Sequence, residues 1–562
     1  MADAQARVPG VEARAGKFPG PSLIPALQAI QERVGWLPRE ELETLSRDVR
    51  RPLYEIQGLI SFYPHFRTDP PPSVALHACH DLSCWLQGAD QRIEELRERY
   101  GDQAGVEFTE VSCIGRCDAA PAVAVGEIPA TADDADALVT AARTRHDAEA
   151  VPRAYAGGAP WPNDPYTAGG PDRYATVRKL LLGDLTADQV ITALQDSGLR
   201  GMGGAGFPTG RKWGLVAAQP GAPKYVICNA DESEPGTFKD RVLMEQDPYA
   251  LVEAITIMAY ACGAEQGYVY IRGEYPLAEA RLRHAIGQAR ARGFLGENAM
   301  GEGFSFDIDV RRGAGAYIAG EETALINSIE GKRAEPRNKP PFPAQSGLFG
   351  KPTAINNVET LLSVLEILRI GGPAFASIGT ANSTGTRLFC LSGCVERPGL
   401  YEFEFGVTLR QVIDAAGGVR GGRSMKAVLL GGAAGSFVGP DTLDTPLTFE
   451  AMREIGATLG SGVVLVLDDT VDVTSLLRRI TQFFRDESCG QCVPCRVGTV
   501  RQEEVLARMV RGTPFGSISQ ELELLADIGA VARDASICGL GQTAVSAVQS
   551  AARLGLLEST GS

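Results

Sequence analysis

The sequence predicts a multidomain α/β protein whose chain is helical near both ends. Its 562 residues, 44% of them hydrophobic, exceed what a single core holds, so at roughly 100–200 residues per domain we expect three to five domains. Strand patterns alternate with helix patterns through most of the middle of the chain. Eight of the 12 cysteines fall into two spaced sets, one in the N-terminal third and one near the C-terminus.

The overall composition limits the class of protein. Charged residues make up 22% of the chain, its net charge is −15 and its pI is about 5.1. An acidic surface repels phosphate backbones and anionic membranes, so we expect neither nucleic acid nor a membrane surface as a partner. No apolar run reaches the roughly 18 residues of a membrane span, and residues 1–7 lack an apolar signal core. We expect a cytoplasmic protein, in which 12 cysteines require an explanation other than disulfides.

The first 150 residues read as helices followed by a small α/β unit. Residues 24–66 carry apolar side chains at helical spacing. Residues 74–78, 106–111 and 122–125 have the pattern of short strands, and residues 90–100 that of a helix with charge pairs four residues apart. This alternation predicts a small α/β domain.

The rest of the chain divides into four parts. Residues 151–171 are rich in Gly, Pro and Ala without periodicity, which predicts an interdomain linker. Residues 174–372 return to an α/β pattern. Residues 383–469 show short strands with Gly-rich turns, and residues 474–557 are helical and carry the last four cysteines.

The first cysteine set has the number and placement of ligands for a [2Fe–2S] cluster. It consists of two pairs: Cys79 with Cys84, and Cys113 with Cys117. Each pair follows a predicted strand, where a loop can turn two thiolates toward one point, and the cluster needs two thiolates per iron. Zinc and unconnected core thiols are the alternatives, although zinc sites more often show C-x₂-C spacing. We expect the neighbouring His77 and His80 to be hydrogen-bonded or solvated rather than ligands.

The second set has the spacing of a [4Fe–4S] site. It combines a tight C-x₂-C-x₂-C run with one remote thiol: Cys489, Cys492, Cys495 and Cys538. Each iron of the cube takes one thiolate, and the intervening Gly and Pro should keep the run from forming a regular helix. Zinc is again the alternative. The four other thiols lack such spacing and should be buried or free: Cys228, Cys262, Cys390 and Cys394.

Residues 201–213 are the densest glycine run and contain G-x-G-x-x-G. The preceding residues 186–197 read as a helix rather than a strand, which argues against a standard dinucleotide-binding turn. Bare glycines still let backbone N–H groups approach an anion, and the following helix N-terminus adds partial positive charge. Arg211 or Lys212 could neutralise a phosphate, and Phe207 offers an aromatic face to a ring. A flexible turn without a ligand is the alternative.

Polar residues follow three further predicted element ends. The strand 224–228 runs into residues 229–236, whose carboxylates could bind ribityl or ribose hydroxyls, or form a solvated acidic turn. Residues 313–323 end in Glu321 and Glu322, which can serve as N-terminal helix charges or hold a ligand. Asn356 and Asn357 can cap a helix or hydrogen-bond a flavin edge.

These motifs together resemble a known family. The runs 201–213, 229–236 and 313–323 and the second cysteine set resemble the NADH-binding flavoprotein subunit of respiratory complex I, its 51-kDa subunit. Residues 25–125, with Gly35-Trp-Leu-Pro, Ser61-Phe-Tyr and the first cysteine set, resemble its 24-kDa subunit. A fusion that keeps both cysteine sets is similar to the β subunit of NAD-dependent formate dehydrogenases that contain molybdenum or tungsten.

The resemblance implies six segments. They are a helical bundle at 20–70, a thioredoxin-like [2Fe–2S] domain at 71–148, a linker at 149–173, a Rossmann-like FMN/NAD domain at 174–375, a β-grasp domain of the soluble-ligand-binding type at 383–470, and a helical [4Fe–4S] bundle at 471–562.

The resemblance also implies site residues. Those for FMN are Gly201, Gly203, Lys212, Asn229, Asp231, Glu232, Tyr317, Glu321, Asn356 and Asn357. Those for NAD(H) are Gly204, Phe207, Lys212, Glu234, Glu322 and Phe342. Leu215 stands where relatives often have an aromatic residue. The eight cysteines would hold the two clusters, and no side chain is expected to act as an acid or base, with Glu322 positioning the dinucleotide.

The implied activity is that of an NAD(H):FMN oxidoreductase subunit. Hydride would pass between nicotinamide and flavin, and single electrons between flavin and the [4Fe–4S] cluster. The implied partner is a molybdopterin-containing catalytic α subunit of a formate dehydrogenase, with further iron–sulfur clusters. The alternatives are the diaphorase subunit of an NAD-linked hydrogenase, a fused arm of complex I, and a non-enzymatic iron–sulfur scaffold.

Overall fold

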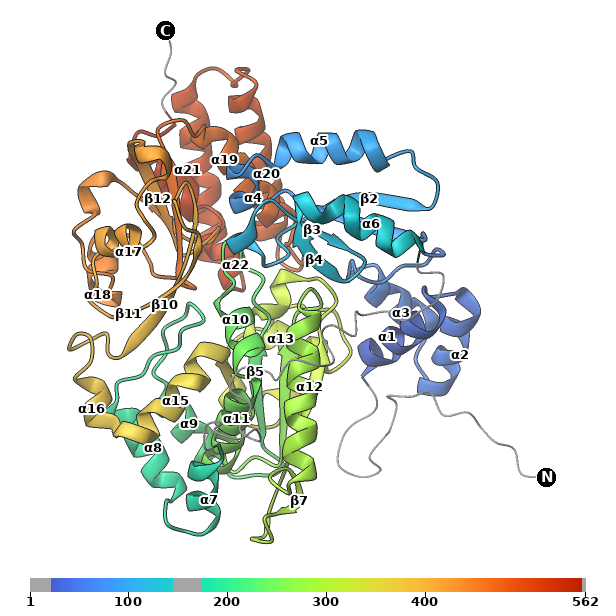
Figure 1. Cartoon of the computed structure of the whole chain (residues 1–562), viewed down its shortest axis with the longest axis vertical. Coiled ribbons are helices and arrows are strands. Elements are labelled where there is room, and N and C mark those ends of the chain that lie inside the picture. Colours follow the sequence, from blue (N-terminus) through green and yellow to red (C-terminus); the bar gives the residue numbers. More distant parts are fainter. Residues whose placement is uncertain (1–21, 145–172, 558–562) are drawn as a thin grey trace.

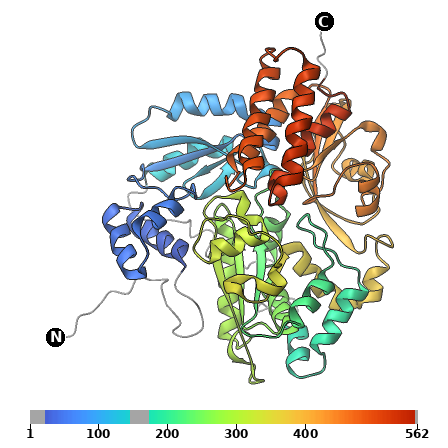
Figure 2. The same ribbon diagram turned by 180° about the vertical axis from the view of Figure 1, so that it is seen from behind.

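The chain folds into five segments that pack against one another (Figures 1 and 2). The computed structural model describes residues 22–144 and 173–557, so nearly all of the predicted linker lies outside the described residues. One buried apolar cluster contains Leu27, Ile318, Leu465 and Leu506, which belong to four different segments. The segments therefore share core between them rather than meeting only at polar surfaces.

The N-terminal segment is helical, as predicted. It consists of α1 (Leu23–Val34), α2 (Arg39–Val49) and α3 (Leu53–Ile60). α1 ends at Gly35, whose φ of 89° suits a residue without a Cβ. Pro38 and Pro52 directly precede α2 and α3, so proline sits just outside each helix, where its missing N–H costs nothing.

The thioredoxin-like domain has a mixed four-stranded sheet in the order β2-β1-β3-β4. Its elements are β1 (Val74–Cys79), α4 (Leu82–Leu86), α5 (Ala89–Tyr100), β2 (Val106–Val111), β3 (Ala122–Val125), β4 (Ile128–Thr131) and α6 (Ala135–Thr144). The three predicted strands are confirmed. The sequence reading missed α4, β4 and α6, which are short or lack a strong apolar repeat.

The large central domain is built on a five-stranded sheet in the order β7-β8-β6-β5-β9, parallel except for β7. Its elements are α7 (Ala175–Leu181), α8 (Ala187–Asp196), α9 (Thr209–Ala217), β5 (Tyr225–Ala230), α10 (Lys239–Gln246), α11 (Pro248–Cys262), β6 (Gln266–Ile271), α12 (Pro276–Ala291), β7 (Gly296–Ala299), β8 (Phe304–Arg312), α13 (Glu322–Ile329), α14 (Pro343–Ser346), β9 (Thr353–Asn357), α15 (Val358–Ile370) and α16 (Gly372–Ala376). Helix α11 is buried along nearly its whole length, because it is apolar on all sides.

The β-grasp domain follows, with a five-stranded sheet in the order β11-β10-β14-β12-β13. Its elements are β10 (Thr386–Gly393), β11 (Gly399–Glu404), α17 (Leu409–Ala415), β12 (Met425–Leu430), β13 (Ser436–Val438), α18 (Phe449–Glu454) and β14 (Val463–Asp468). The central β14 is buried at all six positions, which explains the apolar run from Val463 to Leu467.

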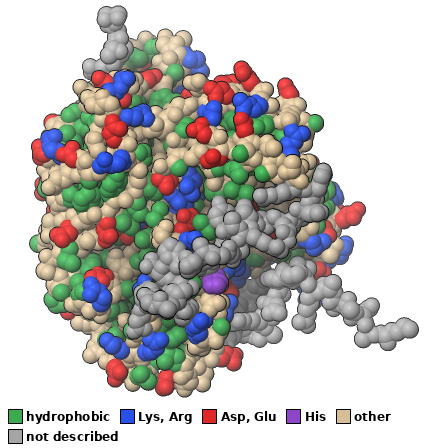
Figure 3. Space-filling model, viewed as in Figure 1, with side chains coloured by type: hydrophobic (Ala, Val, Ile, Leu, Met, Phe, Trp, Pro, Cys, Tyr) green, Lys and Arg blue, Asp and Glu red, His purple; other side chains and the backbone are tan. Residues whose placement is uncertain are grey.

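A helical bundle ends the described chain. It comprises α19 (Val473–Asp486), α20 (Val493–Val510), α21 (Ile518–Ala535), α22 (Gly539–Thr543) and α23 (Ser546–Arg553). The expected fold class is thus confirmed. Of the helices in residues 22–144 and 173–557, none is both long and apolar enough to span a bilayer. Figure 3 shows acidic, basic and hydrophobic side chains interspersed over one face.

Candidate functional site

Most of the predicted ligand-binding residues meet at the carboxyl edge of the central sheet. Asn229 at the end of β5 pairs in register with Asn357 at the end of β9. The segment after β8 brings Tyr317 and Glu321 to the same edge. Ligands of open α/β sheets bind at this edge, so the parallel topology gathers residues that lie more than 100 positions apart.

The glycine-rich loop between α8 and α9 is held open at that edge. The N–H of Gly201 donates to the carbonyl of Phe207 at 2.9 Å, and the N–H of Met202 donates to Thr360 Oγ1 at 2.9 Å. Gly203 and Gly204 are exposed between these anchors. A Cβ on Gly203 would lie 3.1 Å from the Asn357 side chain, so a larger residue would crowd the space that faces the sheet edge. This geometry suits an anion approached by bare backbone.

Several predicted residues anchor the edge through hydrogen bonds. Asn229 Nδ2 donates to the Gly320 carbonyl at 2.8 Å, and Asn356 Oδ1 accepts from Trp213 Nε1 at 2.9 Å. Asp231 Oδ2 is buried and has no hydrogen-bond partner among the residues that the structure describes, and burial raises the pKa of this carboxyl well above its usual value. A buried oxygen left without a donor fits a site that receives hydroxyl groups from a ligand.

Lys212 and Glu322 lie at the mouth of the same site. Lys212 Nζ donates to the Ile355 carbonyl at 2.8 Å, and burial lowers its pKa although Glu322 opposes the shift. Lys339 contacts both Glu321 and Glu322 at 2.8 Å. The sequence reading missed Lys339, and the only available signal was its position just before the Pro340-Pro341 pair.

Glu234 connects the central domain to the β-grasp domain. One carboxylate oxygen accepts from Tyr317 Oη at 2.5 Å, and the other accepts from the N–H of Ala434 at 2.8 Å. Burial raises the pKa of Glu234 to about 7. Gly204 faces Gly460 across the site, with a Cβ position 3.8 Å from the Gly460 carbonyl carbon. The β-grasp domain therefore forms one wall of the site, which the sequence reading did not anticipate.

Glu232 occupies a different position from its neighbours in the acidic loop. Its carboxylate accepts from the N–H groups of Asp240 and Arg241 at 2.8 and 2.9 Å, at the start of α10, and lies 3.1 Å from Tyr275 Oη. Burial raises the pKa of Glu232 to about 8, and the nearby Asp240 adds to the shift. The Glu232 carboxylate is therefore hydrogen-bonded to protein groups on both of its oxygens.

Two aromatic side chains flank the mouth. Phe207 is 40% exposed and Phe342 is 53% exposed, which is unusual for large apolar rings and fits stacking against a ligand. The guanidinium of Arg211 and the ammonium of Lys212 lie 5.8 and 5.9 Å from the Phe207 ring centre. Leu215 is 45% exposed on the neighbouring helix.

The first cysteine set converges. Cys113 Sγ lies 3.4 Å from Cys117 Sγ, and Cys79 lies within hydrogen-bonding contact of both Cys84 and Cys113. Cys84 is in helix α4 rather than in a loop as expected, because Asp81 starts a helical turn directly after β1. All four thiols are buried. Asp81 Oδ2 accepts from Ser112 Oγ at 2.7 Å and from the N–H of Cys113 at 2.8 Å, which ties the two cysteine segments together.

The second cysteine set lines one small cavity. Its walls are formed by Ile318, Pro336, Ser488, Cys489, Gln491, Cys492, Cys495, Ile537, Cys538 and Leu540. The expectation that Gly and Pro prevent a helix here was wrong for Cys495. Helix α20 begins at Val493, and Pro494 is tolerated in the first turn. Burial raises the pKa of Cys495 to about 11 and that of Cys538 to about 12.

The remaining candidates behave as ordinary side chains. No group of three Cys, His, Asp or Glu in the described part of the chain is arranged around a single ion. This agrees with cluster sites, in which each iron takes only one or two cysteine thiolates. His77 Nδ1 contacts Thr109 at 2.5 Å, and His80 lies 3.6 Å from Glu110. The four thiols outside the two sets are buried: Cys228, Cys262, Cys390 and Cys394.

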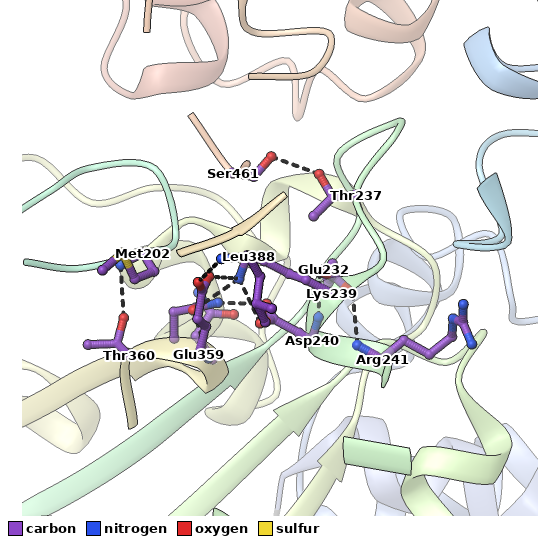
Figure 4. A network of polar contacts seen from close by, with 12 residues as sticks. Met202, Glu232, Thr237, Lys239, Asp240, Arg241, Glu359, Thr360, Leu388 and Ser461 are labelled. Atoms are coloured by element: carbon purple, nitrogen blue, oxygen red, sulfur yellow. Dashed lines mark hydrogen bonds and ion pairs between the residues drawn. The ribbon is translucent and has the colours of Figure 1, made fainter. Parts of the chain in front are cut away.

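A buried polar network lies directly behind the glycine loop (Figure 4). Lys239, only 1% exposed, lies 2.7 Å from Asp240 and 3.0 Å from Glu359. Glu359 also accepts from the N–H of Leu388 in the β-grasp domain at 2.8 Å. The network therefore joins the sheet edge to the neighbouring domain.

Family models match four regions of the chain. Residues 15–142 match a thioredoxin-like [2Fe-2S] ferredoxin, and residues 194–366 match the Nuo51 FMN-binding domain. Residues 387–466 match an SLBB domain, and residues 475–554 match the NADH-ubiquinone oxidoreductase-F iron-sulfur binding region. The chain therefore carries, from its N-terminal to its C-terminal part, regions of the [2Fe–2S], FMN-binding and [4Fe–4S] types.

Individual proteins agree with these matches. The F 2 subunit of NADH-quinone oxidoreductase in Rhizobium meliloti is 48% identical over 361 residues, which cover 64% of this chain and 85% of that protein. The HndC subunit of the NADP-reducing hydrogenase in Solidesulfovibrio fructosivorans is 46% identical over 360 residues, 64% of this chain and 73% of that protein. A chain of the NAD⁺-reducing [NiFe]-hydrogenase in its H₂-reduced state superimposes with a TM-score of 0.83 at 33% identity and covers 95% of this chain and 92% of its own length.

Proposed function

The chain belongs to the family of the F subunit of NADH-quinone oxidoreductase, and from that premise we propose that the sheet edge holds FMN beside NAD(H) while the two cysteine sets hold the clusters. The observation that carries the proposal is the meeting of the exposed glycine loop with Asn229, Asp231 and Asn357 at one edge. The chain is an NAD-dependent flavin and iron–sulfur oxidoreductase subunit with a fused thioredoxin-like domain.

The side chains of the site bind and orient. Bound FMN accepts or gives two electrons as hydride and exchanges them singly with iron–sulfur centres. In the proposal, Gly203 and Gly204 present backbone N–H groups to phosphate, while Gly201 anchors the loop through its hydrogen bond to the Phe207 carbonyl. Asp231 accepts from ribityl hydroxyls. Glu322 turns toward ribose hydroxyls when it leaves Lys339, with which it pairs at 2.8 Å.

The remaining residues that the sequence predicted as ligand contacts lie at positions compatible with the proposed site. Phe207 and Phe342 offer exposed faces for stacking, and Glu234 is fixed by Tyr317 and Ala434. Glu321 caps α13 through the N–H groups of Thr323 and Ala324, so it serves the fold as well as the proposed flavin site. No side chain is assigned a role as general acid or base.

The experiment is cofactor analysis of the full chain, prepared anaerobically, together with NADH-driven reduction of a dye. We expect FMN, iron and acid-labile sulfide, and dye reduction that depends on NADH. Zinc in place of iron and sulfide would refute the cluster assignment. A chain with bound FMN that fails to oxidise NADH would refute the oxidoreductase function and favour an iron–sulfur scaffold.

For the assembly, the proposal assigns the chain to a cytoplasmic formate dehydrogenase with a molybdopterin-containing catalytic subunit. The presence of all four cysteines of the first set supports it, because a fusion that keeps both cysteine sets resembles the β subunit of such formate dehydrogenases. A hydrogenase is the second candidate, supported by the 95% coverage by the [NiFe]-hydrogenase chain. Purification from the host distinguishes them: a large molybdopterin protein supports the first and a nickel–iron protein the second.

Glu322→Ala should weaken NADH binding while FMN stays bound. We expect the Kd for NADH to rise about 10- to 100-fold, because a hydrogen bond to a charged group contributes about 1.5–3 kcal/mol. The measurement is titration of the FMN-loaded chain with NADH, and flavin content gives the second readout. The matched control is Glu366→Ala, whose carboxylate pairs with the exposed Arg369 on the surface of α15. Loss of FMN together with NADH affinity would contradict this division of roles.

A further inference from the structure

Two buried arginines of the central domain hold the segment that carries Cys113 and Cys117. Arg241 of α10 donates through Nε to the Gly115 carbonyl at 3.0 Å. Arg272, which directly follows β6, donates through Nη2 to the Cys113 carbonyl at 2.6 Å and through Nη1 to the Glu232 carbonyl at 2.8 Å. Each arginine is only 4% exposed. The proposed [2Fe–2S] site is therefore completed by groups from outside its own domain.

The two guanidinium groups differ in how their charge is balanced. Arg241 lies between two carboxylates, 2.8 Å from Asp118 and 3.1 Å from Glu245. Arg272 has, within the described residues, one carboxylate partner within 4 Å, which is Glu274 at 3.0 Å. Arg241 is thus locally neutralised, whereas Arg272 and Glu274 form a single pair of opposite charges with the positive member at Cys113.

The surroundings of this segment exclude water. Gly115 has a φ of 72°, and a Cβ on it would lie 2.3 Å from Tyr275 Oη, so the segment fits directly against that ring. Cys113 and Cys117 pack with Phe238 and Cys390, which come from two other domains. In such surroundings charge–charge interactions are much stronger than in water.

We propose that Arg272 tunes the reduction potential of the [2Fe–2S] cluster from across the domain boundary, with Glu274 acting in the opposite direction. The inference rests on the proposed ligation by the first cysteine set. One-electron reduction adds one negative charge to a cluster bound there. A buried positive charge at Cys113 stabilises the reduced form more than the oxidised form, so it raises the potential, and a carboxylate at the same place lowers it.

The same guanidinium links the cluster segment to the acidic loop. Because Arg272 binds the carbonyls of Cys113 and Glu232 together, it fixes the distance between the [2Fe–2S] site and residues 229–236. Arg272 is thus a positioning residue that acts by charge and by geometry, and its two effects require separate readouts.

The test is an EPR-monitored redox titration of the full chain, with dithionite as reductant and ferricyanide as oxidant through mediators. Arg272→Met should shift the [2Fe–2S] midpoint potential to more negative values, and Glu274→Gln should shift it to more positive values. Arg272→Lys, which keeps the charge, should shift it less than Arg272→Met. The control is Arg290→Met, which removes a positive charge beside Asp307, at the opposite end of β8 from the cluster.

If the two substitutions merely loosened the cysteine segment, both should shift the midpoint potential in the same direction. Shifts of opposite sign therefore indicate an effect of charge. Shifts of the same sign, or no shift with an intact EPR signal, would overturn the inference. If the Arg272→Met chain loses the cluster, the Glu274→Gln chain becomes the deciding test. A midpoint potential that does not rise in Glu274→Gln would then overturn the inference. A wild-type chain without any [2Fe–2S] signal would instead refute the proposed ligation by cysteine.

Discussion

Cys495→Ala is expected to abolish electron transfer from the chain to its partner while leaving NADH oxidation by the flavin intact. Cys495 is 5% exposed and lines the cavity that also receives Cys489, Cys492 and Cys538. A cube whose four irons each need one thiolate cannot keep its normal form with three cysteines. We expect the [4Fe–4S] EPR signal to be lost and partner-coupled turnover to fall to background.

The flavin reaction supplies the internal reference for this variant. NADH-driven ferricyanide reduction should stay close to the wild-type rate, because hydride transfer needs only the nucleotide and the flavin. Cys262→Ala removes a buried thiol outside both sets and should preserve both readouts. Cys538→Ala, on a different segment of the bundle, should reproduce the effect of Cys495→Ala. Unchanged coupled turnover in either cluster variant would exclude this cluster from the route.

Of the substitutions considered, Lys239→Met is expected to lower the free energy of unfolding the most. Its ammonium group lies between Asp240 and Glu359 at 2.7 and 3.0 Å, and the three side chains are between 1% and 5% exposed. Removing this cation leaves two buried carboxylates without the charge that lies between them. Breaking a buried ion pair in this way destabilises the folded state by about 3–5 kcal/mol. The midpoint temperature of thermal unfolding of the central domain should therefore fall clearly.

Calorimetry and chemical denaturation measure this effect. Lys351→Met, at an exposed position before β9, is the matched control and should unfold like the wild type. A second substitution, Glu359→Gln, should recover part of the stability lost in Lys239→Met, because it removes one unpaired charge. A Lys239→Met chain as stable as the wild type would show that the network in Figure 4 contributes little to the fold.

Local signals in the sequence were sufficient for most of the elements. Short strands such as β2 and β3 and the helix before the glycine loop follow from the alternation of apolar residues and from boundary residues. The two cysteine sets were also readable, because ligand spacing is a property of neighbouring positions. Short elements were missed, since α4 and β4 span only five and four residues, too few to establish a period.

The roles of individual carboxylates could not be predicted in the same way. Asp231, Glu232 and Glu234 lie within four positions of one another, yet their roles differ. Within residues 22–144 and 173–557, Asp231 has a buried oxygen without a donor, Glu232 accepts from the start of α10, and Glu234 bridges to Ala434. Each role is set by a partner that is remote in sequence. The same holds for Lys339, which lies beside Glu321 and Glu322 although it is 18 and 17 positions away from them in the chain.

The sequence by itself determined the order of the domains, the two groups of thiols and the glycine loop, because each depends on residues within a few positions of one another. Only the tertiary structure decided that the β-grasp domain forms one wall of the proposed nucleotide site through Gly460 and Ala434, and that Arg272 reaches the carbonyl of Cys113. Such contacts depend on how separate sheets pack, and packing is fixed by the summed burial of many side chains rather than by any local pattern.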